Sequence, residues 1–273
     1  MRARRALVGL AVLAVAAAGC GAGGDRPSIL GKEELVIGVK PDQPGLGLKR
    51  QDGAYEGFDV DVAKEVAKRV AGSGVRVRFV DAPSSERERM LRSREVDLVV
   101  ASYSITPKRK TQVGFAGPYY VAHQDILVRR SETRINNVRD LSGRTLCDVT
   151  GSNSYRRVRE EKKIAVRPVE SASYSECVDK LRNGVVDAVS TDDLILAGFA
   201  ASQAGQFKIV NRPFTDERYG IGIHRDDIDG CEAVNKAITQ MYQDGTAKKL
   251  LDKWFGPTDL EYTTTVPEFE GCG

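Results

Sequence analysis

The residue types that most often carry catalysis or hold metals are few and scattered in this sequence. Its two histidines, His123 and His224, lie far apart, and no two of its cysteines form a Cys-x-x-Cys pair. Zinc sites and Ser-His-Asp triads both need such side chains in recognisable patterns. We therefore expect neither a metal site nor a His-based triad, and the sequence indicates no cofactor.

A pair of carboxylates, Asp59 and Asp61, is the acidic motif that comes closest to an acid/base pair. It opens a segment in which apolar residues recur with helical spacing, at Val62, Ala63, Val66, Ala67 and Val70. An Asp at a helix start caps free N–H groups, and a carboxylate in the first turn is favoured by the helix dipole. We interpret Asp59 as the cap and Asp61 as a first-turn residue, not as catalysts.

The elements that would position a site alternate along the chain, as is typical of an α/β fold. With 273 residues and 41% hydrophobic side chains, the chain is long enough for one large domain or two lobes. Two helices are expected near its end, at 230–244 and 246–255. Short apolar runs predict strands at 35–39, 75–80, 97–102, 145–149 and 187–191.

One segment of the chain is repeated. Residues 91–102 and 181–192 align without a gap, with identical Leu, Arg, Val, Asp and Val. Each copy predicts the end of a helix, a tight turn and a buried strand, after which stands Ser102 in one copy and Asp192 in the other. Ligands of open α/β sheets collect beyond the carboxyl ends of strands, so two such ends indicate a cleft between two lobes. The alternative is a chance recurrence of a short helix-turn-strand piece.

Two further strands, at 115–130 and 218–227, are placed to cross between the lobes. One lobe then comprises residues 33–122 and 218–273, and the other comprises residues 123–217.

The charge of the body argues against nucleic acid as the main partner. The chain has 41 Lys and Arg against 38 Asp and Glu, and three of the arginines lie within residues 1–19, which hold no acid. The remaining chain is neutral, whereas nucleic-acid binding depends on an excess of basic residues.

The N-terminus predicts export. Three arginines precede an apolar run at 6–19, which is too short to span a membrane comfortably and has the length of a signal-peptide core. The end of this run, before Cys20, resembles a lipobox, so we expect a signal peptide over 1–19, lipidation of Cys20 and a flexible tether over 20–32. A plain signal-peptidase cut after Ala18 is the alternative.

The motifs of the body resemble those of the extracellular solute-binding proteins, family 3, which serve ABC importers of polar amino acids. The resemblance runs from about Leu35 to Trp254. It implies a two-lobed α/β fold of the periplasmic-binding-protein type II, each lobe a mixed sheet flanked by helices, with an amino acid held between the lobes and no catalysis. The motifs are GFDVDVAKEVAKRV (57–70), ASYSITPKRK (101–110), VTGSNS (149–154) and IGVKPDQPGLGL (37–48), the last similar to glutamate binders.

The resemblance also implies how the ends of an amino acid would be held. Arg109 stands in the position of the arginine that clamps the α-carboxylate, for which a guanidinium fork is suited. Ser102 and Ser104 match positions that contact the α-amino and α-carboxylate groups. Asp192 matches the carboxylate that binds the ammonium group, and Asp193 is expected to face solvent, although a slip of one position would exchange the two.

In the second lobe, Gly151, Asn153 and Ser154 match the second ligand loop. They precede an expected helix at 154–162, whose free N–H groups can receive an anion. Helix capping is the alternative role for both side chains. Lys40 and Arg87 match positions that face the ligand side chain, and two cations there favour glutamate or aspartate. For Arg87 the alternative is a solvent-facing position in the charged run 84–90.

The lobe assignment favours the disulfides Cys147–Cys177 and Cys231–Cys272 among three connectivities, because a bridge between lobes would lock the hinge. The partners implied are glutamate or aspartate, an ABC permease with its ATPase subunit, and the outer face of the cell membrane through the lipid. Two other classes stay open: an exported enzyme on the same fold, such as a cyclohexadienyl dehydratase, and a ligand sensor.

Overall fold

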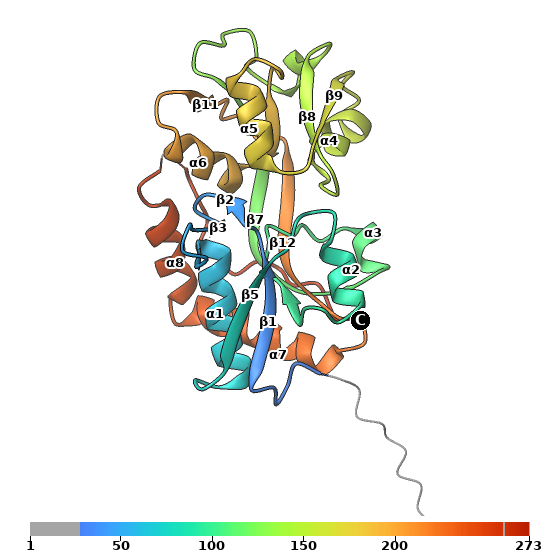
Figure 1. Ribbon diagram of the computed structural model, residues 1–273, viewed down its shortest axis with the longest axis vertical. Helices are drawn as coiled ribbons and strands as arrows, with labels where there is room; N and C mark the ends of the chain where they lie inside the picture. The colour runs from blue at the N-terminus through green and yellow to red at the C-terminus, as the bar shows by residue number, and fades with distance from the viewer. Residues whose placement is uncertain (1–27, 259, 273) are drawn as a thin grey trace, which may run out of the picture.

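The computed structural model describes residues 28–258 and 260–272. Figure 1 shows two α/β lobes, one above the other, with strands β7 (Gly114–Arg129) and β12 (Thr215–Ile223) running between them. These two strands pair with each other antiparallel. They are the segments expected to cross between the lobes, and the two-lobed α/β fold class is confirmed.

The main sheet is continuous through both lobes because β7 and β12 belong to both. Its strand order is β10-β7-β12-β6-β1-β5, and β11 also pairs with β7. Parallel pairing of β5, β1 and β6 forms the lower part. The other strands of this sheet are β1 (Glu34–Val39), β5 (Arg76–Asp81), β6 (Leu98–Val99), β10 (Val189–Asp192) and β11 (Phe207–Ile209).

The remaining strands form two small sheets. One consists of β2 (Asp42–Gln43), β3 (Gly47–Lys49) and β4 (Tyr55–Glu56). The other is the parallel pair β8 (Thr145–Val149) and β9 (Arg167–Ser171) in the upper lobe.

Helices flank the sheets of both lobes. The lower lobe contains α1 (Phe58–Ala71), α2 (Arg87–Arg92), α3 (Pro107–Lys110), α7 (Ile228–Gln243) and α8 (Thr246–Phe255). The upper lobe contains a short 3-10 helix (Val138–Leu141), α4 (Ser154–Arg156), a π-helical turn (Arg157–Glu161), α5 (Tyr174–Arg182) and α6 (Asp193–Ser202).

Helix α1 buries the expected apolar stripe, but the prediction for Asp59 was wrong. The N-cap is Gly57, and no side chain caps the helix. Asp59 lies inside the first turn and is fully buried. Its carboxylate therefore has partners elsewhere in the lobe, described below.

The sequence repeat is a structural repeat. In both copies a helix, α2 or α5, ends in a tight turn that leads into a strand, β6 or β10. The shared Asp has the same role in each: Val36 N–H donates to Asp97 at 2.9 Å, and Thr145 N–H donates to Asp187 at 2.8 Å. Each Asp thus fixes its turn to a strand of its own lobe, β1 for Asp97 and β8 for Asp187.

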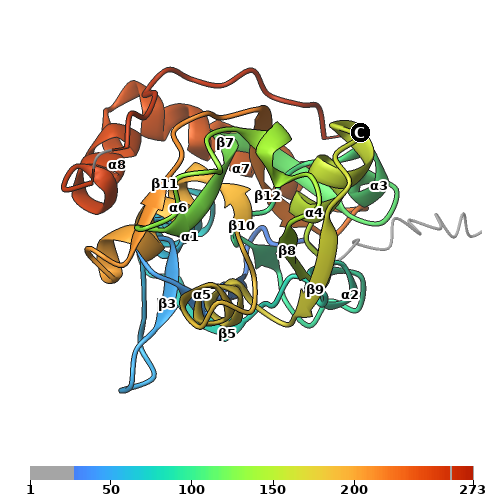
Figure 2. The same ribbon diagram turned by 90° about the horizontal axis from the view of Figure 1, so that it is seen from above.

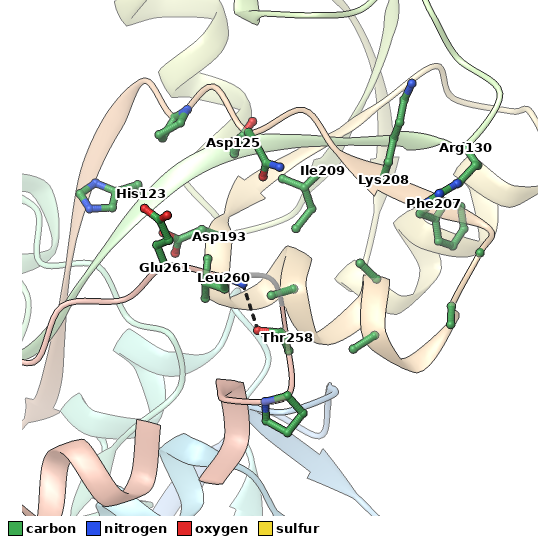
Figure 3. A pocket seen from close by; sticks show the side chains of 18 residues that line it. His123, Asp125, Arg130, Asp193, Phe207, Lys208, Ile209, Thr258, Leu260 and Glu261 are labelled. Atoms are coloured by element: carbon green, nitrogen blue, oxygen red, sulfur yellow. Dashed lines mark hydrogen bonds between the residues drawn. The ribbon is translucent and has the colours of Figure 1, made fainter. Parts of the chain in front are cut away.

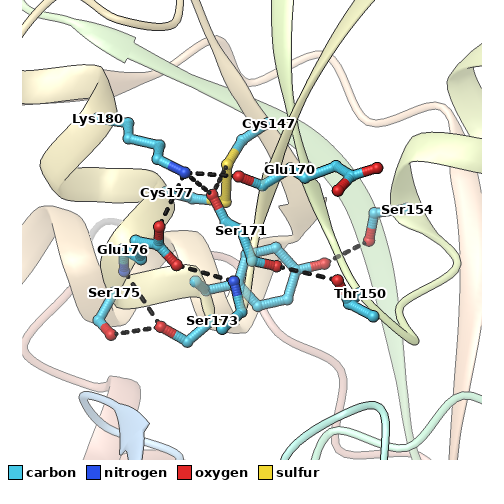
Figure 4. The surroundings of a disulfide bond; sticks show 12 residues. Cys147, Thr150, Ser154, Glu170, Ser171, Ser173, Ser175, Glu176, Cys177 and Lys180 are labelled. Carbon is cyan, nitrogen blue, oxygen red and sulfur yellow. Dashed lines mark hydrogen bonds and ion pairs between the residues drawn. A yellow bond between two sulfur atoms is a disulfide. The ribbon is translucent and has the colours of Figure 1, made fainter.

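Both disulfides have the expected pairing. Cys147–Cys177 joins β8 to α5 in the upper lobe, beside Ser171 and Lys180 (Figure 4). Cys231–Cys272 joins α7 to the C-terminal segment. Figure 2 shows this segment leaving α8 and crossing to the far side of the molecule, near α3.

The N-terminal predictions fall mostly outside the described residues, including the signal peptide at 1–19 and Cys20. Residues 28–32, which we expected in the flexible tether, instead contact the body. Ser28 Oγ and Ile29 N–H both donate to the Asp227 carboxylate, and Ile29 is buried. Within residues 28–258 and 260–272, no helix has the length and hydropathy of a membrane span.

Candidate ligand-binding site

The loop after β6 carries the first group of predicted residues. Ser102 has a left-handed backbone with φ of 43°, and its N–H donates to Asp59 Oδ2 at 2.7 Å. Its hydroxyl donates to Gln43 Oε1 at 2.9 Å. Ser104 lies two residues further, buried, and its carbonyl accepts a hydrogen bond from Arg109 Nη1 at 2.7 Å.

Arg109 connects this loop to the other lobe. It lies in α3, which begins with Pro107 and is capped by Thr106. Its Nη2 donates to the Gly151 carbonyl at 3.1 Å, and its Nε is 3.2 Å from a Glu88 carboxylate oxygen. A buried guanidinium with three polar partners is held in a single orientation. The predicted carboxylate clamp therefore lies where the two ligand loops meet.

Lys40 and Arg87 are both buried in the lower lobe. Lys40 Nζ donates to Ser84 Oγ at 2.5 Å, and Arg87 Nη1 donates to the Ala101 carbonyl at 3.0 Å. Neither forms an ion pair with a carboxylate of the described residues. Because Arg87 is 2% exposed, the alternative of a solvent-facing helix position is excluded. Its guanidinium stacks over the Tyr103 ring at 4.2 Å.

Crowding of positive charge is visible in the pKa values of these two groups. Burial lowers the pKa of Lys40 well below 10.5, and the charges of Arg87 and Arg109 lower it further, while those of Asp42 and Asp59 act in the opposite direction. Burial, followed by repulsion from Arg109, lowers the pKa of Arg87 to about 10. The three cations therefore share one poorly solvated region.

Gly151 brings the second ligand loop against the lower lobe. It has φ of 81°, and a Cβ at this position would lie 2.6 Å from backbone atoms of Ser84 and Ser85. A second contact between the lobes joins Ser175 to Asp42, whose Oδ2 accepts from the Ser175 backbone N–H and hydroxyl at 3.2 and 3.3 Å. Close approach of the lobes at this loop thus requires glycine.

The side chains of Asn153 and Ser154 have partners inside the protein. Asn153 Nδ2 donates to Glu217 Oε2 at 2.9 Å, and Ser154 Oγ is 2.8 Å from the Tyr174 hydroxyl. The helix expected over 154–162 was only partly right. It is α4 for one turn and continues as a π-helical turn to Glu161.

Asp192 ends β10 with its carboxylate buried. Oδ2 accepts a hydrogen bond from the Tyr219 hydroxyl at 2.7 Å. No ion pair joins it to a cation of the described residues. Burial, and then the charge of Glu217, raise the pKa of Asp192 well above its usual range, while the nearby charge of Arg109 acts in the opposite direction.

Asp193 was wrongly expected to face solvent. It is 7% exposed and lines a separate cavity of about 900 Å³ between α6, β11, β7 and the segment after α8 (Figure 3). Burial raises the pKa of Asp193 to about 6. None of the predicted binding residues lines this cavity. The neighbouring carboxylates of Asp192 and Asp193 therefore lie in different surroundings.

Three of the described residues that are hydrogen-bonded to the ligand loops each carry a buried polar atom without a partner. Among the described residues, Gln43 Nε2, Arg87 Nε and Gln124 Oε1 are buried and lack a hydrogen-bond partner. Gln43 is bonded to Ser102, and Gln124 to Ser154. Because buried polar groups normally find partners, these three atoms are available to a further polar group.

Comparison with known proteins agrees with this arrangement. The family model of bacterial extracellular solute-binding proteins, family 3, matches residues 35–257. The chain belongs to this family.

Two relatives and one solved structure show the range of proteins to which this solute-binding protein is similar. The glutamate-binding protein GluB of Corynebacterium efficiens is 40% identical, with 90% of this chain and 87% of the relative covered. The glutamine-binding protein GlnH of Bacillus subtilis is 34% identical, with 83% of each covered. An ancestral arginine-binding protein bound to arginine is 34% identical with a TM-score of 0.76, and covers 83% of this chain and 100% of its own.

Several polar residues of the site were missed from the sequence of this solute-binding protein. Gln43, Glu88 and Tyr219 each contact a predicted site residue. Gln43 lies in the segment 37–48 that resembled glutamate binders, which was the one available signal for it. Glu88 lies in a charged run, where nothing local distinguishes a partly buried carboxylate from an exposed one.

Proposed function

We propose that this protein binds an acidic amino acid, glutamate ahead of aspartate, and delivers it to an ABC permease with its ATPase subunit. The named specificities of its relatives include glutamate, glutamine and arginine. Identity alone therefore does not choose among these ligands. The charges buried at the site support the choice made here.

The observation that carries the proposal is the excess of buried positive charge. Arg109 forms an ion pair with Glu88, whereas neither Lys40 nor Arg87 forms an ion pair among the described residues, although the buried Asp59 carboxylate lies near both. Burying an unpaired charge costs several kcal/mol unless it is neutralised. A ligand with two carboxylates supplies one to Arg109 and a second to Lys40 and Arg87. A neutral side chain would leave those two unpaired.

The opposite charge is in excess at Asp192. Its neighbour Glu217 is 2.7 Å from Arg157, so Glu217 is already paired, while the Asp192 carboxylate has the Tyr219 hydroxyl as its one side-chain partner among the described residues. The α-ammonium group of an amino acid would pair with Asp192 and favour its ionised form. Among the described residues, the site thus has a buried carboxylate without a cation at Asp192 and a surplus of positive charge in the lower lobe, where Lys40, Arg87 and Arg109 lie near Glu88 and Asp59. Glutamate carries charges that complement both.

Contacts from both lobes would allow the protein to capture its ligand without catalysing a reaction. Arg109 and Gly151 approach from different lobes, so a ligand that contacts both stabilises the closed form over an open one. We propose the hinge at β7 and β12, with lobes 33–122 plus 218–273 and 123–217. In this account the protein is a binding protein, not an enzyme.

We also propose that the protein is exported and anchored to the outer face of the cell membrane through a lipid on Cys20. The apolar run at 6–19 and the small residues before Cys20 support this. Metabolic labelling with a fatty acid, compared between the wild type and Cys20→Ala, tests it. Equal labelling of both would overturn it.

The ligand is tested by removing the two cations. Isothermal titration calorimetry with glutamate and with glutamine should show that Lys40→Met and Arg87→Met each weaken glutamate by about a hundredfold or more, and glutamine by less than about tenfold. Arg89→Met is the matched control, because Arg89 lies in the same helix and is exposed. Equal losses for both ligands would overturn the acidic assignment.

A further inference from the structure

A buried carboxylate outside the ligand contacts is tied to the first ligand loop. Asp59, in the first turn of α1, is 0% exposed and accepts two hydrogen bonds. One comes from the Ser102 N–H at 2.7 Å and the other from the Tyr119 hydroxyl at 2.7 Å. Asp59 therefore joins α1, the loop after β6 and the hinge strand β7.

The backbone conformation of Ser102 has to be maintained by contacts, because Ser102 is a non-glycine residue in the left-handed region. L-residues with a side chain disfavour that region, so local contacts must maintain it. The hydrogen bond from the Ser102 N–H to Asp59 is one such contact and acts on the backbone itself.

Ser102 in turn orients two groups of the site. Its hydroxyl donates to Gln43 Oε1, which turns Gln43 Nε2 away as a buried donor without a partner among the described residues. Its carbonyl accepts from Arg87 Nη1 at 3.4 Å. A shift of Ser102 would therefore move both the Gln43 amide and the Arg87 guanidinium.

We propose that Asp59 is a positioning residue of the binding site, which holds Ser102 so that Gln43 and Arg87 face the ligand. The proposal rests on the proposed function for the place of the site, but not on which amino acid binds there. Asp59 touches no ligand in this account.

Asp59 accepts its two hydrogen bonds as an ionised carboxylate, and the groups around it affect this ionisation. The charged and titratable groups near it are Lys40 after β1, Arg87 from α2 and Tyr119 from β7. Burial raises the pKa of Asp59 to about 6, against the two hydrogen bonds and the two cations, which lower it. Protonation would add a donor without an acceptor and weaken the hold on Ser102, so affinity should fall as pH drops below about 6.

The test compares Asp59→Asn with Tyr119→Phe. Each disturbs a bond of the same carboxylate, but only Asp59→Asn changes the group that holds Ser102. The ligand is whichever of glutamate, glutamine and arginine the wild type binds most tightly, and the fold is checked by circular dichroism and the Tm. We expect Asp59→Asn to weaken binding by about tenfold or more at pH 7.5, and Tyr119→Phe by less than about threefold.

A pH series separates positioning from a general loss of structure. Between pH 7.5 and 5, affinity should fall more steeply in the wild type than in Asp59→Asn, because the variant has no proton to gain at this position. The slope that remains in the variant comes from other titratable groups, among them Asp192, whose pKa is raised by burial. Equal slopes, or an affinity of Asp59→Asn within twofold of the wild type, would overturn the proposal.

Two further outcomes are interpreted separately: a variant that does not fold, and a wild type that does not bind the ligands. If Asp59→Asn does not fold, Ser102→Ala, which removes the bond to Gln43, should weaken binding by about tenfold, and unchanged affinity would overturn the proposal. If the wild type binds none of the three amino acids and does not bind aspartate, the proposed function fails, and the positioning role that rests on it fails with it.

Discussion

Arg109 Nη2 donates a hydrogen bond to the Gly151 carbonyl at 3.1 Å, which joins the first ligand loop of the lower lobe to the second ligand loop of the upper lobe. The guanidinium expected to clamp a carboxylate is therefore also a contact between the lobes. If Arg109 binds the ligand as proposed, ligand binding and lobe closure involve the same side chain, and substitutions on either side of this contact should affect affinity.

Gly151→Ala should weaken ligand binding by about tenfold or more. Its Cβ would lie 2.6 Å from the backbone of Ser84 and Ser85 and keep the lobes apart. Titration calorimetry with glutamate measures the effect.

Gly143→Ala is the control for Gly151→Ala. Gly143 has a similar φ of 73°, but a Cβ there would meet no atom within 4 Å. Both variants therefore carry the same backbone strain, and only Gly151→Ala should lose affinity. Similar affinities of the two variants would mean that closure does not bring this loop against the lower lobe.

Asp192→Asn should reduce glutamate affinity by a hundredfold or more, because the ligand ammonium loses its buried partner, at a cost on the order of 3 to 5 kcal/mol. Asp193→Asn is the matched control, since Asp193 is adjacent, similarly buried and directed to the other cavity. We expect its affinity to stay within about threefold of the wild type. A larger loss in Asp193→Asn than in Asp192→Asn would show that the two roles are exchanged.

Features with a local signal were predicted well from the sequence. The repeat of helix end, turn and strand was recognised from identities ninety positions apart, and its two Asp residues have equivalent hydrogen bonds. The stripe on α1 and the ends of α7 and α8 follow from periodicity and turn residues.

Features that depend on distant partners were not predictable in this way. Asp59 has the pattern of a helix cap, but its partner Ser102 lies 43 residues further along the chain. Asp193 follows Asp192 and was assigned to the opposite, solvated side. The chain instead turns into α6 at this residue and encloses its side chain beside the cavity between α6 and β11.

The stability of the ligand-free protein should depend on pH through Asp59. Its pKa is about 6 in the folded state and near 3.8 unfolded, so between these values the folded state holds more protons. Stability from this group is therefore greatest at low pH and is lost as pH rises to about 6. Urea unfolding from pH 4.5 to 7 should show the free-energy difference between the wild type and Asp59→Asn falling with rising pH, by at most about 1.4 kcal/mol per unit.

Other titratable groups with shifted pKa values are present in both the wild type and Asp59→Asn. Their contributions therefore cancel in the difference between the two free energies of unfolding. Glu132 and Asp244, each with a pKa of about 2, contribute in a lower pH range. A difference that stays constant from pH 4.5 to 7 would show that Asp59 is not protonated in this range.

Replacing Cys231 and Cys272 together by serine should lower the free energy of unfolding by about 2 to 4 kcal/mol. The bond closes a loop with a sequence separation of 41, and in the chain-entropy model such a closure stabilises by about 4 kcal/mol. It also holds the C-terminal segment in which Glu270 pairs with Lys110 at 2.9 Å. Urea unfolding of the variant and of the reduced wild type checks this, and an unchanged free energy in the variant would contradict it.

The most direct test of the central claim is a titration of the wild-type protein with glutamate and with glutamine under the same conditions. These ligands have nearly the same size and differ in the charge that Lys40 and Arg87 would neutralise. The account predicts that glutamate binds about a hundredfold more tightly than glutamine, because a site built around buried cations rejects an uncharged analogue. Equal affinity, or tighter binding of glutamine or arginine, would contradict it.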